Sequence, residues 1–136
     1  MTELFLDTEF NGFGGALISM ALVEDDTSWY EVLEVPTNPD PWVAQHVIPF
    51  LMKKPIGLAA FRSSFHSFLK RYDRPKIICD WHADVEHFCR MLAGADYGSS
   101  LDFPCEIRLL TGVKYNSTIP HNALADAQAL KKWWDE

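Results

Sequence analysis

Apolar residues in the first part of the chain form three short runs separated by turn residues, a pattern typical of β-strands. Leu4 to Phe10 begins with consecutive apolar positions, as expected for a strand that is covered on both faces. Ala16 to Val23 is a second apolar run, and Trp29 to Val35 is a third with alternating character. Short turns join these runs, and the first turn, Asn11 to Gly15, contains three glycines. The pattern therefore predicts an antiparallel meander of three strands.

The remainder of the chain predicts helices that alternate with short strands. A helix is expected from Pro41, with Asp40 as its N-cap, until Pro49 disturbs it. Ala60 to Tyr72 carries an apolar stripe of helical period. The other expected elements are a buried strand at Lys76 to Cys79, a helix capped by Asp84, a short strand at Glu106 to Leu110 and a last helix at Asn122 to Trp134. This order predicts an α/β fold, a mixed sheet flanked by helices, in a single domain over residues 1–136.

Composition, the length of apolar runs and cysteine spacing indicate where in the cell the protein is expected. Hydrophobic residues make up 48% of the chain and charged residues 23%, an ordinary balance for a globular protein. No apolar run approaches the roughly 20 residues that span a bilayer, and no signal peptide is recognisable at the amino terminus. Cys79, Cys89 and Cys105 give an odd cysteine count without CxxC spacing. We therefore expect no membrane association, no structural disulfide or zinc, and a cytoplasmic location.

The net charge of −7 bears on whether the protein binds nucleic acid. A broad nucleic-acid-binding face is normally basic, so the charge alone argues against one. The objection weakens if several carboxylates bind divalent cations, because bound ions invert the local sign of the charge. Composition leaves both alternatives open.

The first candidate site is the acidic pair Asp7 and Glu9. Residues two apart on a strand project from the same face, and this pair lies at the strand end, where open sheets place ligand crevices. Two such carboxylates repel each other unless a cation or proton lies between them, although an isolated D-x-E also fits a solvated strand end. The glycines that follow do not make a phosphate loop, because Leu17 replaces the third glycine of the dinucleotide fingerprint and no Gly-Lys-Ser/Thr follows.

Two further segments carry acidic residues near predicted element ends. Asp80 closes the buried strand and Asp84 opens the next helix, so either carboxylate could reach the same crevice; a turn residue and an N-cap are the simpler alternatives. Asp126 lies one turn into the last helix, on the flank of its buried stripe, where a carboxylate requires compensation. His121 precedes that helix, and a histidine can accept a proton at neutral pH.

Together, these segments resemble the histidine-bearing (DEDDh) branch of the DEDD superfamily of 3′–5′ exonucleases, and most closely its small, stand-alone, ribonuclease T-like exoribonucleases of phage or bacterial type. The D-x-E motif is Asp7-Thr8-Glu9, and the H-x(4)-D motif is His121 with Asp126. The second family motif places an aspartate at a helix start after a buried strand, which matches Asp84. Asp80 occupies a position where the family often has asparagine, so this motif departs from the usual run.

The resemblance implies a ribonuclease H-like fold and a two-metal-ion mechanism. Two Mg²⁺ or Mn²⁺ ions around the scissile phosphate would be held by four carboxylates, those of Asp7, Glu9, Asp84 and Asp126. Asp80 would support these ligands without contacting the ions, or would replace Asp84 as a ligand. His121 would act as general base, and the products would be nucleoside 5′-monophosphates from a nucleic acid 3′ end, with RNA favoured over DNA. Small relatives commonly pair, so a homodimer is also compatible. Candidate contacts to the terminal nucleotide are Phe10, Asn11 and Trp81, for which ordinary packing is the competing interpretation.

Three rival interpretations remain. A catalytically silent module that binds nucleic acid or a partner is disfavoured because every motif position is filled. An endonuclease on the same fold also uses carboxylates and two metals, and the H-x(4)-D pair favours the exonuclease over it. A zinc hydrolase would need His82, His87 and Cys89, which fit no recognised ligand spacing.

Overall fold

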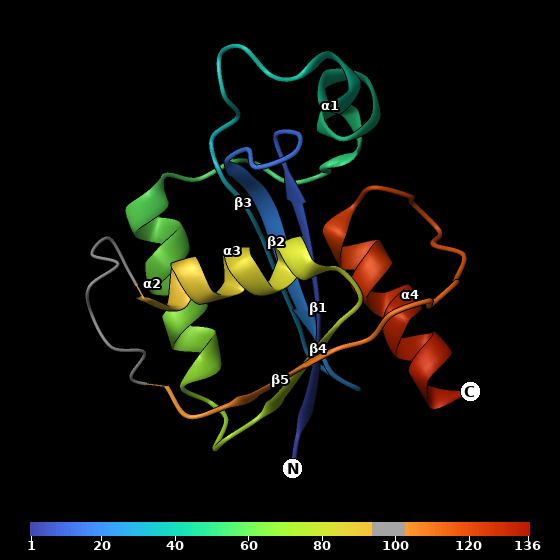
Figure 1. The fold of residues 1–136 in the computed structure, drawn as a ribbon. Helices are drawn as coiled ribbons and strands as arrows, with labels where there is room; N and C mark the ends of the chain where they lie inside the picture. The colour runs from blue at the N-terminus through green and yellow to red at the C-terminus, as the bar shows by residue number, and fades with distance from the viewer. Residues whose placement is uncertain (94–102) are drawn as a thin grey trace.

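The computed structural model describes residues 1–93 and 103–136, and these form an α/β fold around a mixed sheet with strand order β3-β2-β1-β4-β5 (Figure 1). The strands β1 (Glu3–Phe10), β2 (Leu17–Val23) and β3 (Ser28–Val32) form an antiparallel meander. The strand β4 (Lys76–Cys79) pairs parallel with β1, and β5 (Glu106–Leu109) pairs parallel with β4. The predicted mixed sheet and its meander are therefore confirmed.

Helices cover both faces of this sheet. The elements α2 (Leu58–Leu69) and α3 (His82–Ala93) lie on one face and α4 (Ala123–Asp135) lies on the other (Figure 1). The short α1 (Pro41–His46) lies beyond the end of the sheet at which β1 finishes (Figure 1). Within the described ranges, no helix has the length and apolar character needed to cross a membrane.

Several predicted boundaries shift. The third strand was expected to reach Val35 but ends at Val32, because beyond Leu33, whose N–H still donates to the Ile18 carbonyl oxygen of β2, the chain pairs with Ile56 instead. The helix expected at Ala60 to Tyr72 starts two residues earlier and ends at Leu69. Pro49 does disturb the first helix, as predicted, since it lies in the separate 3-10 turn η1 (Ile48–Phe50).

The two faces of β1 belong to two different hydrophobic clusters. Leu4 and Leu6 pack with residues of α2 and α3, whereas Phe5 packs with residues of α4. This alternation is the two-residue period of a strand, and it confirms that the strand is covered on both sides. Further along β1, Asp7 continues on the side of Phe5, towards α4, and Thr8 continues on the opposite side.

The end of β1 is shaped by a bulge and a glycine turn. The register to β2 shifts between Glu9 and Phe10, and such irregularities are common beside active sites because they re-aim side chains. Gly12 and Gly14 adopt φ values of 76° and 70°, which favour glycine. At Gly15 a Cβ atom would lie 1.9 Å from the Asn11 carbonyl oxygen, so only glycine fits there. The glycines therefore turn the strand round, as the sequence predicts.

Candidate metal centre

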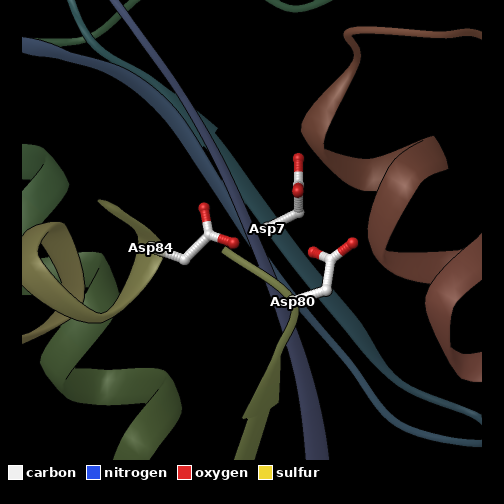
Figure 2. A group of neighbouring side chains, drawn as sticks. All are labelled: Asp7, Asp80 and Asp84. Atoms are coloured by element: carbon white, nitrogen blue, oxygen red, sulfur yellow. The ribbon is translucent and has the colours of Figure 1, made fainter. Parts of the chain in front are cut away.

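All the acidic residues singled out from the sequence converge at the carboxyl end of β1 and β4. Two groups of side chains each bring one carboxylate oxygen per residue to within 4.8 Å of one another. Asp7, Asp80 and Asp84 form the first group, and their carboxyl groups face a common space (Figure 2). Asp7, Glu9 and Asp126 form the second. Asp7 belongs to both groups, so the cluster is continuous.

Strand direction explains why distant segments meet here. Because β1 and β4 run parallel, their carboxyl ends lie at the same edge of the sheet, and Asp80 directly follows β4. Asp126 lies in the first turn of α4, behind Asn122, whose Oδ1 accepts a hydrogen bond of 3.0 Å from the Ala125 backbone N–H. The predicted cap of the last helix is therefore confirmed, and so is the burial of Asp126.

Asp84 reaches the cluster in a different way from the one expected. The prediction that it caps the helix is wrong: α3 begins at His82, and the Asp84 N–H donates to the Trp81 carbonyl oxygen. As a residue of the first turn, Asp84 turns its carboxylate inward, where it is only 1% exposed. Thr8 Oγ1 donates a hydrogen bond of 2.6 Å to Asp84 Oδ1. The helix start and the D-x-E strand are thus joined directly.

Two carboxylate oxygens of the cluster are buried without a protein partner. Among the described residues, neither Asp7 Oδ2 nor Asp84 Oδ2 makes a hydrogen bond. An unpartnered buried carboxylate oxygen is costly and calls for an explanation, such as a bound ion. Asp7 and Asp84 both belong to the first acidic group, so a single cation bound there could compensate both residues.

Burial and the neighbouring carboxylates raise the pKa values of the residues in the cluster. Burial, followed by the charge of Asp84, raises the pKa of Asp7 well above its ordinary value. Burial and the neighbouring Asp126 raise the pKa of Glu9 to about 8. Burial raises the pKa of Asp84 to about 7, although the hydrogen bond from Thr8 opposes the rise. Burial likewise raises the pKa of Asp80 and of Asp126. Without a cation, the cluster therefore retains protons near neutral pH.

The donor set fits a hard divalent cation. Every ligand atom in the two groups is a carboxylate oxygen, which suits Mg²⁺ or Mn²⁺ rather than zinc. Asp80 and Asp84 both belong to the first group, so the geometry does not force a choice between them. Within the described ranges, His82, His87 and Cys89 form no such group, and the His87 ring stacks on Phe10 with ring centroids 5.1 Å apart.

The cluster opens into a cavity of about 740 Å³ that also contains His121. Aromatic side chains line this cavity beside the carboxylates: Phe10, Phe13, Trp42, Trp81 and Tyr115. Of the three predicted substrate contacts, Phe10 and Trp81 therefore border the cavity. Asn11 does not line it: its Oδ1 accepts a hydrogen bond of 2.7 Å from the Asp40 backbone N–H, which is a structural role.

Sequence reasoning missed several residues around the centre. Thr8 supports Asp84, and a hydrogen bond from Tyr115 lowers the pKa of Asp80 against the larger effect of burial. The hydroxyl between the two acids of the D-x-E motif was a signal that could have identified Thr8. No comparable signal existed for Tyr115, because it lies in an irregular segment between β5 and α4. Phe13 and Trp42 were missed for the same reason, since a loop or short-helix aromatic has no pattern that points to a site.

Comparison with known proteins does not assign the chain to a family. No protein-family model matches it, and neither a curated protein nor a solved structure is significantly similar to it. The functional inference therefore rests on the geometry of the acidic cluster together with the sequence motifs.

Proposed function

We propose that this protein is a metal-dependent 3′–5′ exonuclease with a ribonuclease H-like fold. It would release nucleoside 5′-monophosphates from the 3′ end of a nucleic acid, with RNA favoured over DNA. The observation that carries the proposal is the pair of carboxylate groups that share Asp7, each with its ligand oxygens within 4.8 Å. Two adjoining all-oxygen groups suit the two divalent ions of phosphodiester hydrolysis.

The arrangement of elements supports the same proposal. An antiparallel meander followed by parallel strands, with helices on both faces, is the arrangement that the exonuclease resemblance implies. The residues of the ordered motifs, far apart in sequence, meet at one end of this sheet: Asp7, Glu9, Asp84, His121 and Asp126.

Each group of residues at the site has its own role in the proposed reaction. Mg²⁺ or Mn²⁺ would be held by the carboxylates of four residues: Asp7, Glu9, Asp84 and Asp126. Asp80 would support Asp84 or be the alternative to it. When bound, such ions lower the pKa of water and stabilise charge on phosphate and leaving-group oxygens. The His121 imidazole, on the wall of the same cavity, would accept the proton of the attacking water. Phe10 and Trp81, which border the cavity, would contact the terminal nucleotide.

The experiment that tests the function is digestion of end-labelled RNA and DNA with Mg²⁺ or Mn²⁺, using substrates with a free or a blocked 3′ end. An exonuclease releases mononucleotides from the free end and leaves the blocked substrate intact. Internal cleavage of the blocked substrate would favour the endonuclease. Metal-dependent binding without any cleavage would favour the silent module.

Substitutions in the shared cluster test the site. Asp7→Ala and Asp126→Asn should abolish metal-dependent 3′ trimming, because each removes a charged ligand, with Asp7 common to both groups. Activity is measured on the preferred substrate, and circular dichroism checks that the variants fold. Asp73→Asn provides a control, since Asp73 is exposed and does not line the cavity. Full activity in either cluster variant would contradict the assignment.

A further inference from the structure

The side chain of Trp42, on α1, contacts the proposed general base. Its ring lies edge-on to that of His121, with the ring centroids 4.9 Å apart and 78° between the planes. The His46 ring also stacks on the indole, with the ring centroids 4.7 Å apart and 21° between the planes. Trp42 and His121 both line the cavity that holds the acidic cluster. The indole therefore contacts both imidazoles, and of these three rings Trp42 and His121 line the cavity.

The backbone of His121 has an unusual conformation, so what holds this residue in place matters. His121 has a φ of 66°, in the left-handed region that residues other than glycine seldom adopt. Such a conformation persists only where the surrounding structure holds it. Its neighbour Asn122 is fixed by the cap of α4, but this anchors the backbone rather than the imidazole. The direction of the imidazole depends on the side chains it touches.

The element that carries Trp42 is itself held from two sides. Asp40 caps α1 by accepting hydrogen bonds from the N–H groups of Trp42 and Val43, at 3.0 and 3.4 Å. The Asp40 N–H in turn donates to Asn11 Oδ1 in the turn after β1. On the other side, Asn122 Nδ2 donates a hydrogen bond of 2.7 Å to the carbonyl oxygen of Phe50 in η1. The backbone of α1 is thus tied to the turn after β1, and the adjoining η1 is tied to the start of α4.

We propose that Trp42 is a positioning residue for His121. The indole sets the direction of the imidazole, so that its nitrogen meets the attacking water beside the cluster. The inference rests on the proposed function, in which His121 is the general base. It also assigns Asn11 an indirect role, as the side chain that ties α1 to the end of the D-x-E strand.

Kinetics of two Trp42 variants test the proposal. Trp42→Leu removes the flat ring and should lower kcat by about 10- to 100-fold with little change in KM, because misplacing a catalytic group by about 1 Å can cost 100-fold. Trp42→Phe keeps an aromatic ring and should recover most of kcat. Trp133→Leu is the control, since Trp133 is 39% exposed on α4 and does not line the cavity. It should leave kcat and KM unchanged.

Two kinetic outcomes would overturn the proposal. A rise in KM with unchanged kcat in Trp42→Leu would mean that the indole binds substrate, for example by stacking on a base. Wild-type values of both constants would mean that the contact has no role in the reaction.

A second measurement is independent of activity. In the NMR spectrum, Trp42→Leu should shift the His121 ring signals, which are assigned by their loss in His121→Gln. Trp81→Leu is the matched control, because Trp81 lines the cavity and is 48% exposed, as against 49% for Trp42, but contacts His82 instead. Unmoved His121 signals in Trp42→Leu would overturn the positioning role alone. An inactive wild-type protein with a large shift would instead count against the proposed function, and with it the catalytic role of the contact.

Discussion

At the scale of single residues, Asp80 and Asp84 differ in burial and in hydrogen-bond partners. Asp84 is buried, one of its oxygens accepts the Thr8 hydroxyl, and the other has no partner among the described residues. Asp80 is less buried and is supported by Tyr115. In the proposed site, the unpartnered buried Oδ2 favours Asp84 over Asp80 as the ligand.

Substitution of these two aspartates should therefore have unequal effects. Asp80→Asn should lower kcat/KM by about 10- to 100-fold, the usual cost of losing a residue that supports a metal ligand. Asp84→Asn should cost clearly more, because it removes the charge and places an amide where a buried oxygen has no partner. Both variants are compared on one substrate over a Mg²⁺ titration. A larger loss in Asp80→Asn would show that Asp80 is the principal ligand.

At the scale of elements, Asn122 joins the start of α4 to the segment after α1. Its Oδ1 accepts from the Ala125 N–H, and its Nδ2 donates to the carbonyl oxygens of Phe50 and, at 3.4 Å, Leu51. The Asn122 side chain is buried, and its hydrogen bonds with Ala125 and Leu51 are buried, whereas that to Phe50 is partly buried. Since α4 carries Asp126 and follows His121, this junction sets the position of the third motif.

Removal of the Asn122 side chain should destabilise the protein. Asn122→Ala should lower the free energy of unfolding by about 2–3 kcal/mol, from about 1 kcal/mol for the cap and about 1 kcal/mol for each lost buried hydrogen bond. Urea denaturation measures the change. Asn116→Ala, at an exposed position, should change stability by less than about 0.5 kcal/mol. An equal effect of the two substitutions would contradict the described junction.

At the scale of the whole molecule, the raised pKa values of the acidic cluster couple the stability of the fold to pH. The pKa of Glu9 is raised to about 8 and that of Asp84 to about 7, above the ordinary values near 4. Between about pH 4 and pH 8 the folded protein therefore binds more protons at these groups than the unfolded chain. Their contribution to the free energy of unfolding is present at low pH and is lost as the pH rises through that window.

Two thermal measurements follow from this linkage. In a chelator, the melting temperature should fall between pH 5 and pH 8 as the cluster loses its protons. Addition of Mg²⁺ or Mn²⁺ should restore stability, and more strongly at pH 8, because a cation replaces the protons and binds the folded state. Asp7→Asn is the comparison, since it removes a charge shared by both groups and should weaken both responses. A metal-free wild type that gains stability from pH 5 to pH 8 relative to Asp7→Asn would contradict the cluster's titration.

Much of the fold was predictable because its signals are local. The consecutive apolar residues at the start of β1 predicted burial on both faces, and the Asn122 cap predicted the start of α4. The start of α3 was predicted wrongly because an aspartate near a helix start is ambiguous from sequence. Aspartate is a common N-cap residue, but the Thr8 hydroxyl, on β1, holds the Asp84 carboxylate inside the first turn of α3.

Local patterns identified the candidate site residues: the acidic pair on one strand face, the two later aspartates, and the His121–Asp126 pair at a helix start. Strand and helix periods set the face that a side chain occupies, and this information is local. The packing of the folded chain, in contrast, brings the carboxylates into two groups that share Asp7, places Asp80 with Asp84, and puts Trp42 in contact with His121. Distances between elements depend on the parallel pairing of β4 with β1 and on the packing of helices at the sheet end. No local pattern contains those distances.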